Sequence, residues 1–166
     1  MQSDPLFLDL RIALDNAEPT RKILLDHLAD RGNKAAQLTT SQQALLDAGV
    51  AQVIQSLYTA AENLLLKIAA SIDGGTPAKD ENWHAALLAR MSHAFPGRRP
   101  VVLSPQTTET LNQLRGFRHV ARNTYAHTLD RERLMVHAEL AVRLFPLLTA
   151  DVDKLERYLT SESGPD

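Results

Sequence analysis

The sequence of 166 residues contains no cysteine, and only 5% of its residues are aromatic. The lack of cysteine excludes disulfide bonds, thiol nucleophiles and cysteine-ligated metal centres, and it fits a reducing compartment such as the cytoplasm. No segment approaches the 18 or so uninterrupted apolar residues of a membrane span. The N-terminal residues, 1–5, have no basic region before an apolar run, so we expect no secretory signal. The sequence therefore predicts a cytoplasmic protein with no membrane contact.

Several motifs that carry common chemistries are also missing. There is no glycine-rich phosphate loop, no His-Glu-x-x-His, no Gly-x-Ser-x-Gly and no EF-hand loop. No two of the six histidines are three or four residues apart, the spacing that places two metal ligands on one helix face. These histidines are His27, His84, His93, His119, His127 and His137. We therefore expect neither a metal site nor a cofactor.

Apolar residues recur every three or four positions along most of the chain, which is typical of amphipathic helices. Helices are predicted over residues 4–31, 39–72, 81–94, 105–125 and 130–159. Pro19 is expected to interrupt the first helix and Pro146 to kink the last one. Only residues 100–103 resemble a strand. The sequence predicts an all-α fold, a single domain over residues 1–166 built as an up-and-down bundle of four main helices plus a short extra helix.

Positive charge is concentrated in one part of a chain whose net charge is −2. Between residues 98 and 127 there are five arginines and one acidic residue, Glu109, which gives this stretch a net charge of +4. Such a zone can steer a phosphate-bearing ligand to one place. The alternative is that the arginines only solvate a helix face.

The helix predicted over 105–125 carries a basic stripe opposite its apolar face. Arg115, then Arg118 or His119, then Arg122 follow steps of three and four. Arg115, Arg118 and His119 are therefore candidate substrate-binding residues. The stripe leads to a segment near the helix end, residues 122–127.

Within that segment, Arg122, Asn123 and His127 are the candidate catalytic residues. Asn123 and His127 are four apart and share a face, but Arg122 and His127 are five apart, about 140° around an ideal helix. The last two would meet only if the helix ended beside His127 or if the site were assembled from two chains.

Arginine and histidine without metal ligands suit RNA cleavage by the substrate's own 2′-hydroxyl. Histidine exchanges a proton near neutral pH, and arginine forks onto phosphate oxygens and stabilises the charge that grows on them. The competing interpretation is that Arg122 and His127 are ordinary solvated residues at a helix end.

Three stretches, Ser56–Glu62, Asp80–His84 and Leu111–His127 followed by Leu129 and Asp130, occur in an order that resembles the HEPN superfamily, specifically its HepT-like ribonuclease toxins. The resemblance implies a HEPN-like core over about 40–160, preceded by an N-terminal helical extension over 4–31. It also implies a metal-independent endoribonuclease that forms a homodimer, builds its cleft from two copies of the Arg122-to-His127 motif and pairs with a nucleotidyltransferase-like antitoxin.

The chain departs from this pattern at one position. HepT toxins that receive AMP from their antitoxin carry a tyrosine two residues after the histidine, where this chain has Leu129. Tyr125, two residues before His127, is then a candidate modification site, although a core tyrosine is an equal interpretation. Two alternatives stay open: a non-catalytic HEPN module that binds a partner protein or nucleotide, and a plain helical bundle.

Two further residues have simple interpretations. Glu62 lies on the second predicted helix, where a solvated charge is favoured over contact with the motif. Trp83, the one tryptophan, is expected to anchor the core or a helix end.

Overall fold

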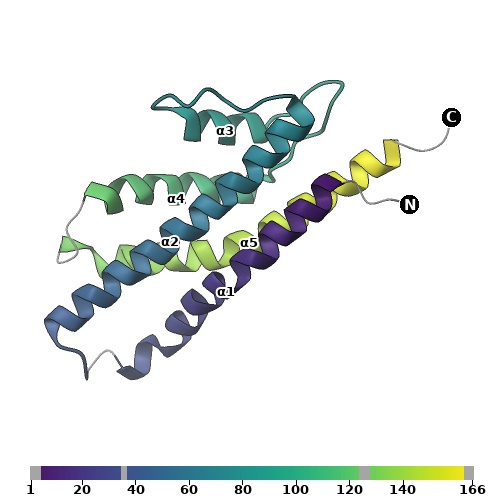
Figure 1. The fold of residues 1–166 in the computed structure, drawn as a ribbon. Helices are drawn as coiled ribbons and strands as arrows, with labels where there is room; N and C mark the ends of the chain where they lie inside the picture. The colour runs from purple at the N-terminus through teal and green to yellow at the C-terminus, as the bar shows by residue number, and fades with distance from the viewer. Residues whose placement is uncertain (1–4, 35–36, 124–127, 163–166) are drawn as a thin grey trace.

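A computed structural model describes residues 5–34, 37–123 and 128–162, and these are helical over most of their length. The order along the chain is α1 (Pro5–Lys34), α2 (Thr40–Ile68), a π-helical turn η2 (Ala69–Asp73), α3 (Trp83–Met91), α4 (Pro105–Asn123) and α5 (Arg131–Glu162). Figure 1 shows α1, α2, α4 and α5 running alternately up and down, with the short α3 at one end. The all-α bundle of four main helices plus a short one is thus confirmed.

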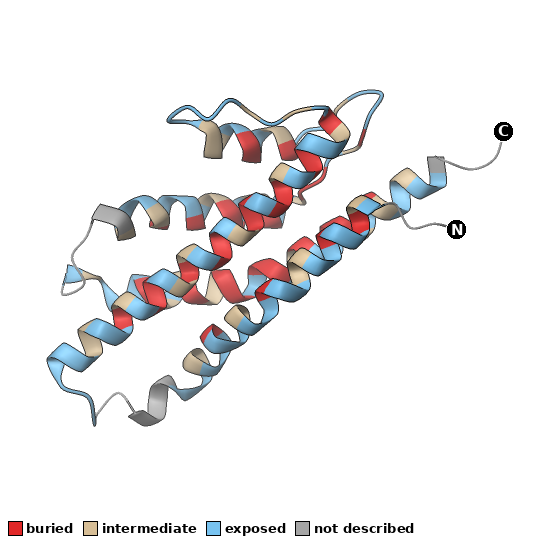
Figure 2. Cartoon of the chain, viewed as in Figure 1, coloured by how far each residue is buried: buried red, intermediate tan, exposed pale blue. Residues whose placement is uncertain are grey.

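The core lies along the inner faces of the four long helices (Figure 2). α1 packs against α2 and α5, and α4 packs against the other side of the same two helices. Fully buried side chains come from every long helix, for example Leu10, Ile54, Leu114 and Leu144. Within the described residues, no helix is long and apolar enough to cross a bilayer.

Three helix starts are fixed by side-chain caps that the sequence pattern indicates. Thr39 caps α2 in a capping box with Gln42. The Ser104 hydroxyl accepts the Thr107 amide at 3.2 Å, and Pro105 occupies the first position of α4. The Asp130 carboxylate accepts the Arg133 amide at 3.2 Å at the start of α5. The Ser104 and Asp130 caps fix the starts of α4 and α5, the two helices that flank residues 124–127.

Two local predictions are wrong, and the strand-like stretch is not a strand. Pro19 does not divide α1, which continues from Pro5 to Lys34. α3 spans Trp83–Met91 and is shorter than the helix expected over 81–94. Residues 100–103 form no strand; instead the amides of Val102 and Leu103 both donate to the Met91 carbonyl and tie this segment to the end of α3.

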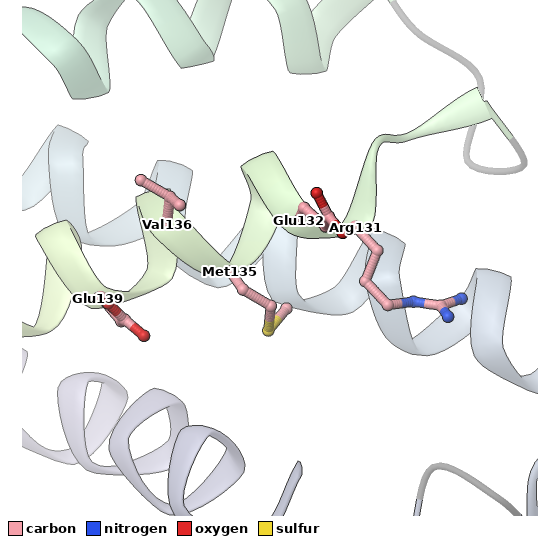
Figure 3. A pocket seen from close by; sticks show the side chains of 5 residues that line it. All are labelled: Arg131, Glu132, Met135, Val136 and Glu139. Atoms are coloured by element: carbon pink, nitrogen blue, oxygen red, sulfur yellow. The ribbon is translucent and has the colours of Figure 1, made fainter. Parts of the chain in front are cut away.

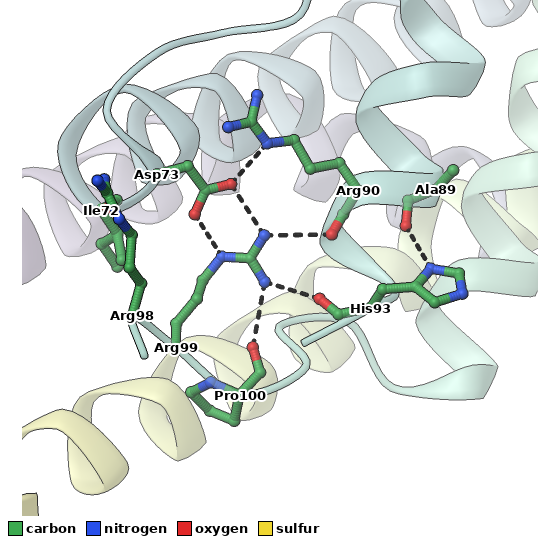
Figure 4. Close-up of polar contacts among 8 residues, drawn as sticks. All are labelled: Ile72, Asp73, Ala89, Arg90, His93, Arg98, Arg99 and Pro100. Atoms are coloured by element: carbon green, nitrogen blue, oxygen red, sulfur yellow. Dashed lines mark hydrogen bonds and ion pairs between the residues drawn. The ribbon is translucent and has the colours of Figure 1, made fainter. Parts of the chain in front are cut away.

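A buried ion cluster fastens α3 to η2, the turn that directly follows α2 (Figure 4). The Arg99 guanidinium makes a two-pronged contact with Asp73, at 2.6 and 2.9 Å, and also donates to three backbone carbonyls. Arg90 of α3 binds the same carboxylate at 2.7 Å. Burial raises the pKa of Asp73, but its hydrogen bonds and charge pairing with Arg99 and Arg90 outweigh burial and hold the pKa below its usual value.

Candidate functional site

The basic face of α4 forms one wall of an open pocket whose other wall is the start of α3. The pocket has a volume of about 340 Å³. Its lining residues are Glu81, Asn82, His84, Ala85, Arg115, Gly116, Arg118 and His119. All three of the candidate substrate-binding residues are therefore brought together here, as their helical spacing predicts. The only carboxylate among the lining residues is Glu81.

The candidate catalytic residues follow directly on this face. Arg122 and Asn123 are the last two residues of α4, one turn beyond Arg118, and their side chains lie outside the described part of the chain. Tyr125 and His127 also lie outside the described residues. Their catalytic and modification roles therefore stay predictions. The chain resumes at Thr128, Leu129 and the Asp130 cap of α5.

A chain of polar contacts runs from this pocket into the core. Nη1 of Arg118 lies 2.7 Å from Nε2 of His84, and Nδ1 of His84 contacts the Glu62 carboxylate. Because a guanidinium has only donors, Arg118 presents an N–H to the His84 ring, with Nη1 also 3.3 Å from Nδ1, and the Glu62 carboxylate accepts from Nδ1 in the tautomer that carries its proton there. Three helices, α2, α3 and α4, thus meet in one hydrogen-bonded network.

Glu62 occupies an inward-facing position of α2 and is only 2% exposed. The interpretation of Glu62 as a solvated charge is therefore wrong. A buried carboxylate is tolerated when it is paired and hydrogen-bonded, and His84 supplies that partner. Trp83, whose ring centroid lies 3.8 Å from that of His84, packs against the core as expected.

The Tyr58 hydroxyl lies one turn before Glu62 and is fully buried without a hydrogen-bond partner of ordinary geometry. Burial, followed by the nearby Glu62 charge, raises the pKa of this phenol. Arg115 and Arg118 lower it by a smaller amount. Tyr58 therefore stays neutral over the physiological pH range.

The basic zone predicted between residues 98 and 127 is divided in the structure. Arg99 is buried against Asp73, and Arg98 donates to the Ile72 carbonyl at 3.2 Å. Both arginines therefore contact η2, and neither lines the groove on α4. Only Arg115 and Arg118, among the described side chains, carry the positive charge of the α4 face.

A second groove lies across α4 from the first. It has a volume of about 380 Å³ and is lined by Gln113, Gly116, Phe117, Val120, Thr128, Leu129, Asp130, Arg133 and His137. Gly116 lines both grooves, and a Cβ there would meet nothing within 4 Å. The surface of α4 between the two grooves is therefore open.

A third hollow lies along the first turns of α5, as Figure 3 shows. Its lining residues, Arg131, Glu132, Met135, Val136 and Glu139, all belong to α5. Arg131 contacts the buried Asp47 of α2 at 3.1 Å, and this contact anchors the chain just after residues 124–127. The mixed charges make this hollow a poorer anion site than the α4 face.

The described residues contain no group of three or more side chains that could share a metal ion. The sequence alone indicates no role for His84, and for Glu62 it favours a solvated charge, whereas this side chain is buried. A local signal existed for Glu62, since it falls on the apolar stripe between Tyr58 and Leu65. None existed for His84, because its partners lie 22 and 34 residues away.

The fold and the site together define a small all-helical bundle with a cationic groove on its penultimate long helix, beside an Arg-to-His segment. The chain belongs to the HepT-like family: the family model described as HepT-like protein matches residues 49–159. The match includes α3, α4 and most of α2 and α5, and it leaves α1 outside. No curated protein and no solved structure matches the chain.

Proposed function

We propose that this protein is a metal-independent endoribonuclease and the toxin of a type II-like toxin–antitoxin pair. The observation that carries the proposal is the α4 face, where Arg115 and Arg118 line a groove, two turns and one turn before Arg122 respectively. This face lies inside the part of the chain that matches the HepT-like family. An RNA strand supplies the repeated phosphates that such a row of arginines binds.

In the proposed reaction, the 2′-hydroxyl of the RNA attacks the adjacent phosphorus. The P–O bond to the 5′ oxygen of the next nucleotide breaks, and a 2′,3′-cyclic phosphate and a 5′-hydroxyl form. His127 takes the proton from the 2′-hydroxyl or gives one to the departing 5′ oxygen, and solvent water exchanges the other proton. Arg122 stabilises the charge on the phosphate oxygens, and Asn123 orients the substrate.

The site works as a homodimer in this proposal, as the HepT-like resemblance implies, with the cleft built from two copies of the Arg122-to-His127 motif. A two-fold dimer places two copies of the motif at one interface. Val120 and Val136 support this arrangement, since they are exposed apolar residues near either end of the motif in the sequence. The second partner is a nucleotidyltransferase-like antitoxin, expected in the neighbouring reading frame.

The test is RNA cleavage by the purified full chain in the presence of a chelator. We expect products with 2′,3′-cyclic phosphate ends, and growth arrest when the protein is expressed. His127→Ala and Arg122→Ala are expected to lower the cleavage rate at least about 100-fold, the scale of general acid–base and charge stabilisation. His93→Ala and Arg143→Ala, which remove the same side chains elsewhere, serve as matched controls.

Unchanged toxicity of a folded His127→Ala protein would contradict the proposal. Absence of cleavage at every protein concentration, together with a stable complex to a neighbouring gene product, would favour a non-catalytic partner-binding module. Leu129, which replaces the tyrosine that receives AMP in other HepT toxins, bears on how the toxin is regulated and not on RNA cleavage. Intact-mass measurement after incubation with the antitoxin and ATP shows whether Tyr125 is modified instead.

A further inference from the structure

Arg115 and Arg118 line the same groove but are held very differently. Arg115 is exposed, and its one described side-chain contact is to Asn112 on the same helix at 3.4 Å. Arg118 is half-buried and donates to His84, which is itself fixed by the buried Glu62. A guanidinium fixed in advance loses less conformational entropy when it binds a ligand. Arg118 is therefore the better prepared of the two cations.

The contact with His84 leaves Arg118 donors for a ligand, since a guanidinium carries five N–H groups. Arg118 lies one helical turn before Arg122, so their Cα atoms are about 6 Å apart along α4. This distance is comparable with the spacing between successive phosphates of a single strand. An RNA with its scissile phosphate at Arg122 would then present the adjacent phosphate to Arg118.

We propose that Arg118 binds the RNA phosphate next to the scissile one, and that His84 and Glu62 are positioning residues that hold Arg118 for this contact. This inference rests on the proposed function. It assigns the groove between α3 and α4 as a phosphate subsite. Arg115, on the previous turn, contributes a weaker and more mobile charge to the same strand.

The first experiment measures binding of a labelled 2′-O-methyl RNA of about twelve nucleotides by fluorescence anisotropy over a range of salt concentrations. This RNA has no free 2′-hydroxyl, so binding is separated from cleavage. Arg118→Gln is expected to weaken binding roughly tenfold and to reduce the slope of log K against log salt by about 0.7. Arg115→Gln is expected to have a smaller effect, and Arg143→Gln, on the distant part of α5, none.

The second experiment tests positioning by His84. His84→Leu removes both contacts but leaves the Arg118 charge in place, so it is expected to cause part of the Arg118→Gln loss in binding and to leave the salt slope nearly unchanged. The His84→Gln side chain can still donate to Glu62 and accept from Arg118, so it is expected to restore most of the affinity. In the Arg118→Gln background, His84→Leu should cause no further loss, because positioning residues act through the residue they hold.

Equal binding by folded Arg118→Gln and Arg143→Gln proteins would overturn the subsite, as would losses from His84→Leu and Arg118→Gln that simply add. If His84→Leu does not fold, Arg118→Gln and His84→Gln still decide the question. His127-dependent cleavage with an unchanged KM in Arg118→Gln would reject the subsite alone. Arg118-dependent binding without cleavage of ordinary RNA would reject the ribonuclease and keep the subsite.

Discussion

Asp73 holds α3 and the loop that follows it against η2. Its carboxylate is fully buried and binds both Arg99 and Arg90. Asp73→Asn keeps the shape but leaves the Arg99 guanidinium buried without a counter-charge. We expect the free energy of unfolding to fall by about 3–5 kcal/mol, measured by urea denaturation. A loss below about 1 kcal/mol would mean that the backbone carbonyls around Arg99 suffice.

The Asp73 carboxylate also makes the free energy of unfolding depend on pH in the acid range. Because the folded pKa of Asp73 lies below its unfolded value, its contribution is complete above the unfolded pKa of about 4 and is lost as the pH falls through the folded pKa. Thermal unfolding between pH 2 and pH 6 measures this loss. The stability difference between wild type and Asp73→Asn is expected to shrink towards the acid end, and a constant difference would contradict the assignment.

Tyr58 acts at the opposite end of the pH scale. Its folded pKa is raised, so the phenol stays protonated in the native state while the unfolded chain releases the proton above about pH 10. Native stability should therefore fall above pH 10, by up to about 1.4 kcal/mol per pH unit. Tyr58→Phe should lose this dependence and change the stability at neutral pH by less than about 1 kcal/mol, because the burial of the hydroxyl and its interaction with Glu62 oppose each other. Tyr158→Phe, at an exposed tyrosine, is the control for both measurements.

At the scale of elements, α1 is the helix that the family match leaves outside, yet it fills the same core as α2 and α5. Leu10 is 0% exposed, whereas Leu8, two residues earlier, is 56% exposed. Leu10→Ala is expected to lower the free energy of unfolding by about 2–5 kcal/mol and Leu8→Ala by less than about 0.5 kcal/mol, measured by urea denaturation. Similar small losses for both would show that α1 is dispensable for folding.

Helix positions were largely predictable because apolar spacing and caps act locally, as at Thr39, Ser104 and Asp130. The prediction that Pro19 interrupts the first helix is wrong because the free-energy cost of a proline inside a helix competes with tertiary packing. Ala17 and Leu24 are buried on either side of it, while Pro19 itself is exposed, so the hydrogen bond it removes lies on the solvent side of α1. Local propensity alone carries no information about that balance.

The candidate site was predictable only where it lies on one helix. The period of α4 places Arg115, Arg118 and His119 on one face, and the groove confirms that these residues lie together. His84 and Glu62 reach Arg118 from two other helices, so their contact depends on how α2, α3 and α4 pack. The clustering of arginines in the sequence likewise does not distinguish Arg99, which is buried in an ion pair with Asp73, from the arginines that line the groove.

At the scale of the whole molecule, the proposed site depends on a second copy of the chain. The bundle carries one α4 face, which ends at Arg122 and Asn123, four residues before His127. If the site used only one chain, inactivating either residue would be final. If each site takes Arg122 from one protomer and His127 from its partner, two inactive variants can rescue each other.

We therefore expect complementation between Arg122→Ala and His127→Ala. Mixed dimers would contain one site that lacks both residues and one site that has both. Random mixing makes half of the dimers mixed, so roughly a quarter of the wild-type cleavage rate should return. The measurement is cleavage after unfolding and refolding the variants together, with each variant refolded alone as the control and the dimer fraction checked by light scattering. No recovery in verified mixed dimers would show that Arg122 and His127 act within one chain.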